Sequence, residues 1–127
     1  MIFSILVRSI NFDVEGEVEV VVGDVQLTCF ANNIPFEIKV GGRYEVEFYP
    51  MVFDEYFVED AGEVGDSIDR HGKGYSYKVV GRLNEGCVSC GELMFCDEFL
   101  AEDFGFLDGR MVSWIIDRLD VSFVKEI

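Results

Sequence analysis

Carboxylates alternate with apolar side chains in two stretches of this chain, and they are the first residues whose spacing could do chemistry. Between residues 13 and 22, acids take one phase and valines the other, and from 43 to 48 the acids again alternate with apolar residues. A period of two places successive side chains on opposite faces of a β-strand. The pattern predicts two strands with an acidic outer face, and its candidate partner-binding residues are Glu15, Glu17, Glu19, Glu45 and Glu47.

Two interpretations of this acidic face are open at the sequence level. If the two strands are neighbours, like charges lie opposite one another, which is destabilising by about 0.2–1 kcal/mol per pair. A functional interpretation is that a basic partner relieves this repulsion and is guided by the complementary charge. The other interpretation is a solvated face that Arg8, Lys39 and Arg43 partly neutralise.

The four cysteines could bind a metal or carry redox chemistry. Cys87 and Cys90 form one C-x-x-C pair, but a structural zinc site usually joins two such pairs or adds histidines. A redox pair would open a helix, which the following residues do not suggest. Cys29 and Cys96 are therefore predicted to be small core residues, and neither a metal site nor a cofactor is expected.

His71 is the only histidine of the chain. No nucleophile or orienting carboxylate stands at a recognisable spacing from it, so a solvated loop position is favoured. The chain also has no P-loop, dinucleotide fingerprint or nucleophile elbow. A non-enzymatic protein is expected, and a metal-assisted or thiol enzyme using Cys87, Cys90 and His71 is the alternative to test.

Aromatic residues stand among acids in two further segments. One holds Phe53, Tyr56 and Phe57, and the other spans residues 97–106. Apolar anchors rimmed by charge suit a protein interface, where the aromatic side chains supply most of the binding energy. Tyr56 and Phe57 are the candidate anchors, although the same pattern fits a core patched between acidic surfaces.

Composition limits the classes of partner. The chain has 127 residues, half of them hydrophobic, with 25 acids against 10 bases and a net charge of −15. Such a charge repels nucleic acids and anionic membranes and favours basic partners. No apolar run reaches the roughly 18–20 residues of a membrane span, and the start lacks the features of a signal peptide. A single domain over residues 1–127 is predicted, cytoplasmic and with reduced thiols, and its oligomeric state stays open.

Alternation and turn residues predict a mostly β fold, a single small antiparallel β-barrel of about six strands with at most one or two short helices. Residues 97–104 are expected to form helical turns with Asp97 as the N-cap, and residues 60–74 a long loop. Residues 111–124 fit both helical and strand spacing, and their β-branched and aromatic content favours a strand. Residues 12–22 either continue a first strand over residues 2–11 round a bend at Gly16 or form a second strand. The other expected strands are residues 25–31, 43–49, 75–83, 87–95 and 111–124.

The first half of the chain resembles the small OB-like β-barrels. The resemblance depends on the coiled ribbon around Gly16, the segment Leu27-Thr28-Cys29-Phe30-Ala31, and the strand from Gly42 to Glu47. It implies a barrel that binds oligonucleotides or oligosaccharides across one face. The chain departs from the resemblance on that face, where it has glutamates and nucleic-acid binders need lysine and arginine.

The leading hypothesis is a non-enzymatic acidic binding protein of the immunity or inhibitor type. It would present its carboxylate-rich face to a basic partner protein such as a toxin or nuclease. The alternative is an OB-like module that binds an oligosaccharide or small ligand in an aromatic-lined groove. Self-association as a structural subunit is a further hypothesis, which sedimentation would test.

Overall fold

The computed structural model describes all residues from 1 to 127 and is mostly β, with eleven strands, one α-helix and one 3-10 helix. Neither helix is long or apolar enough to span a membrane. The residues group into two compact units. We call Met1–Tyr49 with Leu119–Ile127 the barrel unit, and Pro50–Arg118 the sheet unit.

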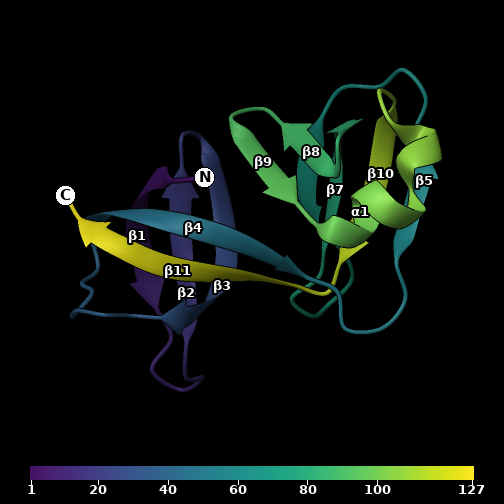
Figure 1. Cartoon of the computed structure of the whole chain (residues 1–127). Helices are drawn as coiled ribbons and strands as arrows, with labels where there is room; N and C mark the ends of the chain where they lie inside the picture. Colours follow the sequence, from purple (N-terminus) through teal and green to yellow (C-terminus); the bar gives the residue numbers. More distant parts are fainter. The chain divides into compact units, whose positions relative to one another are not determined.

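The barrel unit is a closed five-stranded barrel in the order β1-β2-β3-β11-β4 (Figure 1). β1 pairs antiparallel with both β2 and β4, β2 pairs antiparallel with β3, and β3 pairs in parallel with β11. Buried residues recur at every second position in the central part of β1 to β4, as their alternating sequence predicts, whereas Leu119, Asp120 and Val121 of β11 are all buried. The strands are β1 (Phe3–Ile10), β2 (Glu17–Val22), β3 (Val25–Asn33), β4 (Arg43–Met51) and β11 (Arg118–Glu126).

The sheet unit is a six-stranded sheet in the order β5-β10-β7-β8-β9, with β6 also paired to β7. Trp114 of β10 and Val79 of β7 are partners across the sheet and both are fully buried, as is Leu100 of the helix. The elements are β5 (Phe57–Asp60), β6 (Ser67–Arg70), β7 (Tyr77–Asn84), β8 (Cys87–Cys90), β9 (Leu93–Cys96), α1 (Glu98–Asp103), the 3-10 helix η1 (Gly105–Leu107) and β10 (Met111–Ile116).

The prediction of a mostly β chain with a small barrel and at most two short helices is confirmed. The Asp97 carboxylate caps α1 as expected, accepting from the Phe99 main chain. The strand count of about six was too low. Residues 60–74 contain β6, residues 87–95 divide at a turn after Cys90, and residues 111–124 divide at Asp117.

The second strand of the barrel unit is shorter than residues 12–22. Residues 12–16 form a turn, so the second strand begins only at Glu17, because Gly16 has a φ of +86° that suits a turn. The residues group into two compact units, and the expectation that residues 1–127 are a single domain stays a prediction.

Candidate functional site

The predicted glutamates of the barrel unit do not form one ladder. β2 and β4 pair with opposite sides of β1, so β1 separates Glu17 and Glu19 from Glu45 and Glu47. Glu15 lies in the turn before β2. The repulsion between facing carboxylates, on which the functional interpretation depended, is absent because Glu19 is opposite Ser9 and Thr28 instead.

Polar neighbours already contact several of these carboxylates. Asn11 donates to Glu17 at 2.7 Å, and Glu19 accepts from Gln26 and lies 3.7 Å from the Arg8 guanidinium. The Tyr49 hydroxyl donates to Glu47 at 2.9 Å. These glutamates are thus scattered over the barrel surface, and their role in binding stays a prediction.

Tyr56, by contrast, joins the two aromatic segments that the sequence shows separately. Its ring centroid lies 5.3 Å from that of Phe99 and 6.4 Å from that of Phe104, which in turn lies 6.2 Å from Phe106. Phe99 is 51% exposed and Phe106 is 75% exposed. These four rings form a continuous, partly exposed aromatic row along α1 and η1.

Carboxylates border this row. The Tyr56 hydroxyl donates to Asp97 at 2.7 Å, and Glu98, Glu102 and Asp103 lie exposed on α1 without forming an ion pair. Burial first, and then the hydrogen bond to Asp97, raises the pKa of Tyr56 above its usual range. We call the four rings and these four acids the α1 surface.

A shallow groove opens beside the α1 surface. It has a volume of about 320 Å³, and Tyr56, Phe99 and Met51 supply apolar walls while Asp97 and Glu98 supply carboxylates. An apolar groove with acidic edges can accept an alkyl or aromatic side chain that carries, or stands next to, a positive charge. Sequence reasoning had named both aromatic segments but not their contact, because ring packing across 43 residues of chain leaves no local pattern.

Phe57, the second predicted anchor, does not join the α1 surface. Its partner across the β5–β10 pair is Ile115, whereas its neighbour Val58 is the partner of the buried Trp114. Successive strand residues face opposite sides of a sheet. Phe57 therefore faces away from Trp114, onto which Tyr56 stacks at 6.5 Å.

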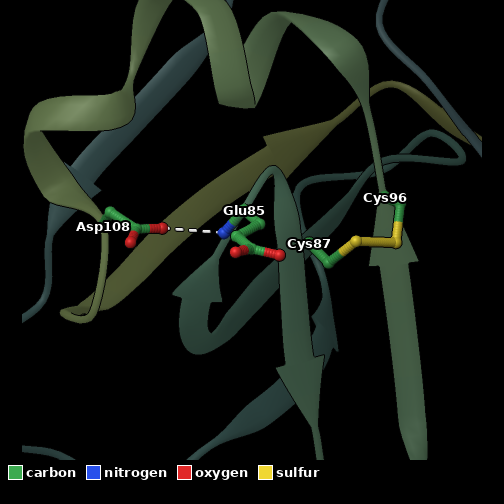
Figure 2. The surroundings of a disulfide bond; sticks show 4 residues. All are labelled: Glu85, Cys87, Cys96 and Asp108. Atoms are coloured by element: carbon green, nitrogen blue, oxygen red, sulfur yellow. Dashed lines mark hydrogen bonds between the residues drawn. A yellow bond between two sulfur atoms is a disulfide. The ribbon is translucent and has the colours of Figure 1, made fainter.

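The cysteines pair differently from the expectation. Cys87 of β8 and Cys96 of β9 are bonded as a disulfide across the hairpin (Figure 2). The predictions of reduced thiols throughout and of a core position for Cys96 were therefore wrong. Cys29 is buried as expected, and Cys90 is buried as well. A sequence signal for the pairing exists, because Cys87 and Cys96 are equally distant from the Gly91-Glu92 turn.

The disulfide stands at the base of the segment that carries the α1 surface. Cys96 directly precedes the N-cap Asp97, whose main-chain N–H donates to the Gly86 carbonyl at 3.0 Å. Next to Cys87, the Glu85 N–H donates to the Asp108 carboxylate at 2.7 Å (Figure 2). These bonds hold both ends of the 97–108 segment to the β7–β8 turn.

His71 lies exposed at the β6–β7 turn, and its main-chain N–H donates to the Ser76 carbonyl at 2.9 Å. It is not near Cys87 or Cys90 by strand pairing, since those residues belong to β8 at the other end of β7. No three His, Cys, Asp or Glu side chains come together as metal ligands. The expectations of no metal site and no cofactor remain predictions.

A family comparison covers nearly the whole chain. The profile of the family described as "Uncharacterised conserved protein UCP019853" matches residues 1–124. The chain belongs to this family. No curated protein and no solved structure matches the chain.

Proposed function

We propose that this protein is a non-enzymatic acidic binding protein that recognises a basic partner protein through the α1 surface. One observation carries the proposal: a row of four contacting aromatic rings, two of them at least half exposed, bordered by acids that form no ion pair. Exposed aromatic anchors surrounded by uncompensated charge combine binding energy with charge selection.

The immunity or inhibitor form of this proposal names the partner as a basic toxin or nuclease. The net charge of −15 and the small size of the chain support it. A cytoplasmic location also belongs to the proposal, and the disulfide is the observation that counts against it, because disulfides are rare in reducing compartments.

Photo-crosslinking tests the proposal directly. A photoreactive phenylalanine at position 106, and in a separate variant at position 12 on the barrel unit, is irradiated in the source cells, and the captured protein is identified and purified. We expect a basic protein captured from position 106 only. Binding of the purified partner should weaken roughly tenfold or more when Phe99 and Phe106 are changed to alanine, and should weaken as salt is raised.

A matched pair of charge variants locates the contact. The triple variant Glu98→Gln/Glu102→Gln/Asp103→Asn should lower affinity, and Glu15→Gln/Glu17→Gln/Glu19→Gln, with the same change in net charge, should affect it less. A larger loss of affinity in the Glu15, Glu17 and Glu19 variant would place the binding site at the predicted glutamates of the barrel instead. Capture of no basic partner, or an affinity indifferent to salt and to both aromatic changes, would refute the proposal.

An OB-like binding module is the second candidate function. Three consecutive antiparallel strands, β1 to β3, and the last strand β11, which lies parallel to β3 and between it and β4, support an OB-like barrel. A groove of about 350 Å³ on this unit is lined by Ile10, Phe12, Phe36 and Glu37, and Phe12 is 89% exposed. Binding of an oligosaccharide that persists in high salt and is lost in Phe12→Ala would favour this candidate.

A further inference from the structure

A second groove of the sheet unit lies on the side of the sheet that faces away from Trp114. Its volume is about 400 Å³, and Phe57 and Ile115 form its apolar floor. The two residues are direct partners across the β5–β10 pair. Phe57 is 54% exposed, so about half of its surface is accessible to a ligand.

Two carboxylates stand beside this floor. Asp117 directly follows β10, and two hydrogen bonds hold it in place. Its main-chain N–H donates to the Met51 carbonyl at 2.9 Å, and its Oδ2 accepts from the Phe53 N–H at 2.8 Å. Glu55 comes from the segment before β5 and lines the same groove. The remaining lining residues are His71 and Ser76, which the 2.9 Å main-chain bond across the β6–β7 turn holds together.

Neither Glu55 nor Asp117 takes part in an ion pair. The nearest cation by strand register is Lys78, the partner of Ile115 across the β10–β7 pair, and it is exposed and forms no ion pair either. The Arg118 guanidinium lies 5.2 Å from the centre of the Phe53 ring. The groove thus combines an aromatic and aliphatic floor with two carboxylates that have no cation of their own.

We propose that this groove binds an organic cation, an ammonium or guanidinium group carried on an alkyl chain. Carboxylates bind such a head group through charge-assisted hydrogen bonds, and the face of an aromatic ring attracts it as well. The alkyl chain would cover Phe57 and Ile115, and Ser76 and His71 offer further polar contacts. The inference is independent of the α1 surface, since Phe57 and Tyr56 face opposite sides of the sheet.

Agmatine, a butyl chain with a guanidinium at one end and an ammonium at the other, is the probe for the test. We expect saturable shifts of the His71, Ser76 and Ile115 amide signals when agmatine is added to the isotope-labelled full chain. Butylurea, which has a similar length without a charge, should cause none. A second arm uses a capped peptide with a single arginine, and tighter binding of the peptide would identify the ligand as a protein side chain rather than a free amine.

Variants then assign the contacts. Glu55→Gln should weaken agmatine binding by roughly 3- to 5-fold, the range of a solvent-accessible ion pair, and Phe57→Ala should weaken it as well. Lys78→Gln should tighten it because a competing positive charge is removed. Glu92→Gln is the matched control, since Glu92 lies in the β8–β9 turn outside the groove. Shifts that do not saturate, equal effects of Glu55→Gln and Glu92→Gln, or equal binding of butylurea would overturn the inference, whatever becomes of the α1 surface.

Discussion

At the scale of single residues, Asp97 connects two parts of the sheet unit. Its Oδ1 caps α1 by accepting from the Phe99 N–H at 2.8 Å, and its Oδ2 accepts from the Tyr56 hydroxyl at 2.7 Å. The Tyr56 ring also stacks nearly parallel on the buried Trp114, at an interplanar angle of 13°. One side chain therefore fixes the start of α1 and the orientation of the central ring of the α1 surface.

Changing Tyr56 to phenylalanine keeps the ring and removes the hydrogen bond. We expect the free energy of unfolding at pH 7 to fall by about 1 kcal/mol, the usual net value of such a bond. Urea unfolding followed by tryptophan fluorescence measures it, since Trp114 is the only tryptophan. Tyr49→Phe, which removes an exposed hydroxyl that donates to Glu47, is the control and should change stability by less than about 0.5 kcal/mol.

The difference in stability between the natural chain and Tyr56→Phe should depend on pH. Because folding raises the pKa of Tyr56, the native state holds the hydroxyl proton more tightly than the unfolded chain. This contribution is complete below the ordinary tyrosine pKa of about 10 and is lost progressively as pH rises above it. The stability advantage of the natural chain over Tyr56→Phe should therefore be constant from pH 7 to 9 and shrink above pH 10. Parallel curves through pH 11 would contradict the assignment.

At the scale of elements, the β8–β9 hairpin shows what local patterns do and do not predict. The apolar alternation of residues 87–95 predicted a strand, and strands indeed occupy most of it. The prediction missed the two-residue turn at Gly91, whose φ of +58° suits glycine. Once the turn is placed at Gly91-Glu92, Cys87 and Cys96 lie at the same distance from it on the two strands and are therefore cross-strand partners. Without it, the C-x-x-C spacing of Cys87 and Cys90 drew attention to the wrong pair.

Removing the disulfide should destabilise this hairpin. It joins residues nine apart in sequence, and closing a loop of that size is worth about 2–3 kcal/mol through the unfolded chain. We expect Cys87→Ser/Cys96→Ser to unfold at correspondingly lower urea, and reductant to shift the natural chain by the same amount while leaving the variant unchanged. Native protein should show no rapidly reacting thiol, because burial raises the pKa of Cys29 and raises that of Cys90 to about 11. Four accessible thiols in the purified protein would contradict the disulfide.

At the scale of the whole molecule, charge alone does not locate a site. The barrel unit carries 10 acids and 4 bases, and the sheet unit 15 acids and 6 bases, so both are strongly acidic. The strand periodicity was predictable because it depends on neighbours in sequence, and many short strands with glycine-rich turns favoured a barrel. The separation of Glu19 from Glu45 by β1, and the meeting of Tyr56 with Phe99, depend on which distant segments pair and were not predictable from a period of two.

The sheet unit is inserted between two strands of the barrel that run side by side (Figure 1). The Met51 carbonyl accepts from the Asp117 N–H at 2.9 Å near one end of β4 and β11, and the Arg43 carbonyl accepts from the Ile127 N–H at 3.0 Å near the other. The two strands are thus antiparallel, and the chain leaves and re-enters the barrel at adjacent points. Two-residue turns can join antiparallel strands in this arrangement.

Replacing residues 52–116 with an Asn-Gly turn should therefore leave a folded barrel. We expect dispersed amide signals and cooperative unfolding, at a lower stability than the full chain because a domain of about 60 residues buries a smaller fraction of its surface. The control ends the same chain after residue 51 and so lacks β11, which leaves the barrel open between β3 and β4 and should not fold. If the Asn-Gly chain is as disordered as this control, the barrel depends on the inserted residues for its stability, and the two units fold as one domain.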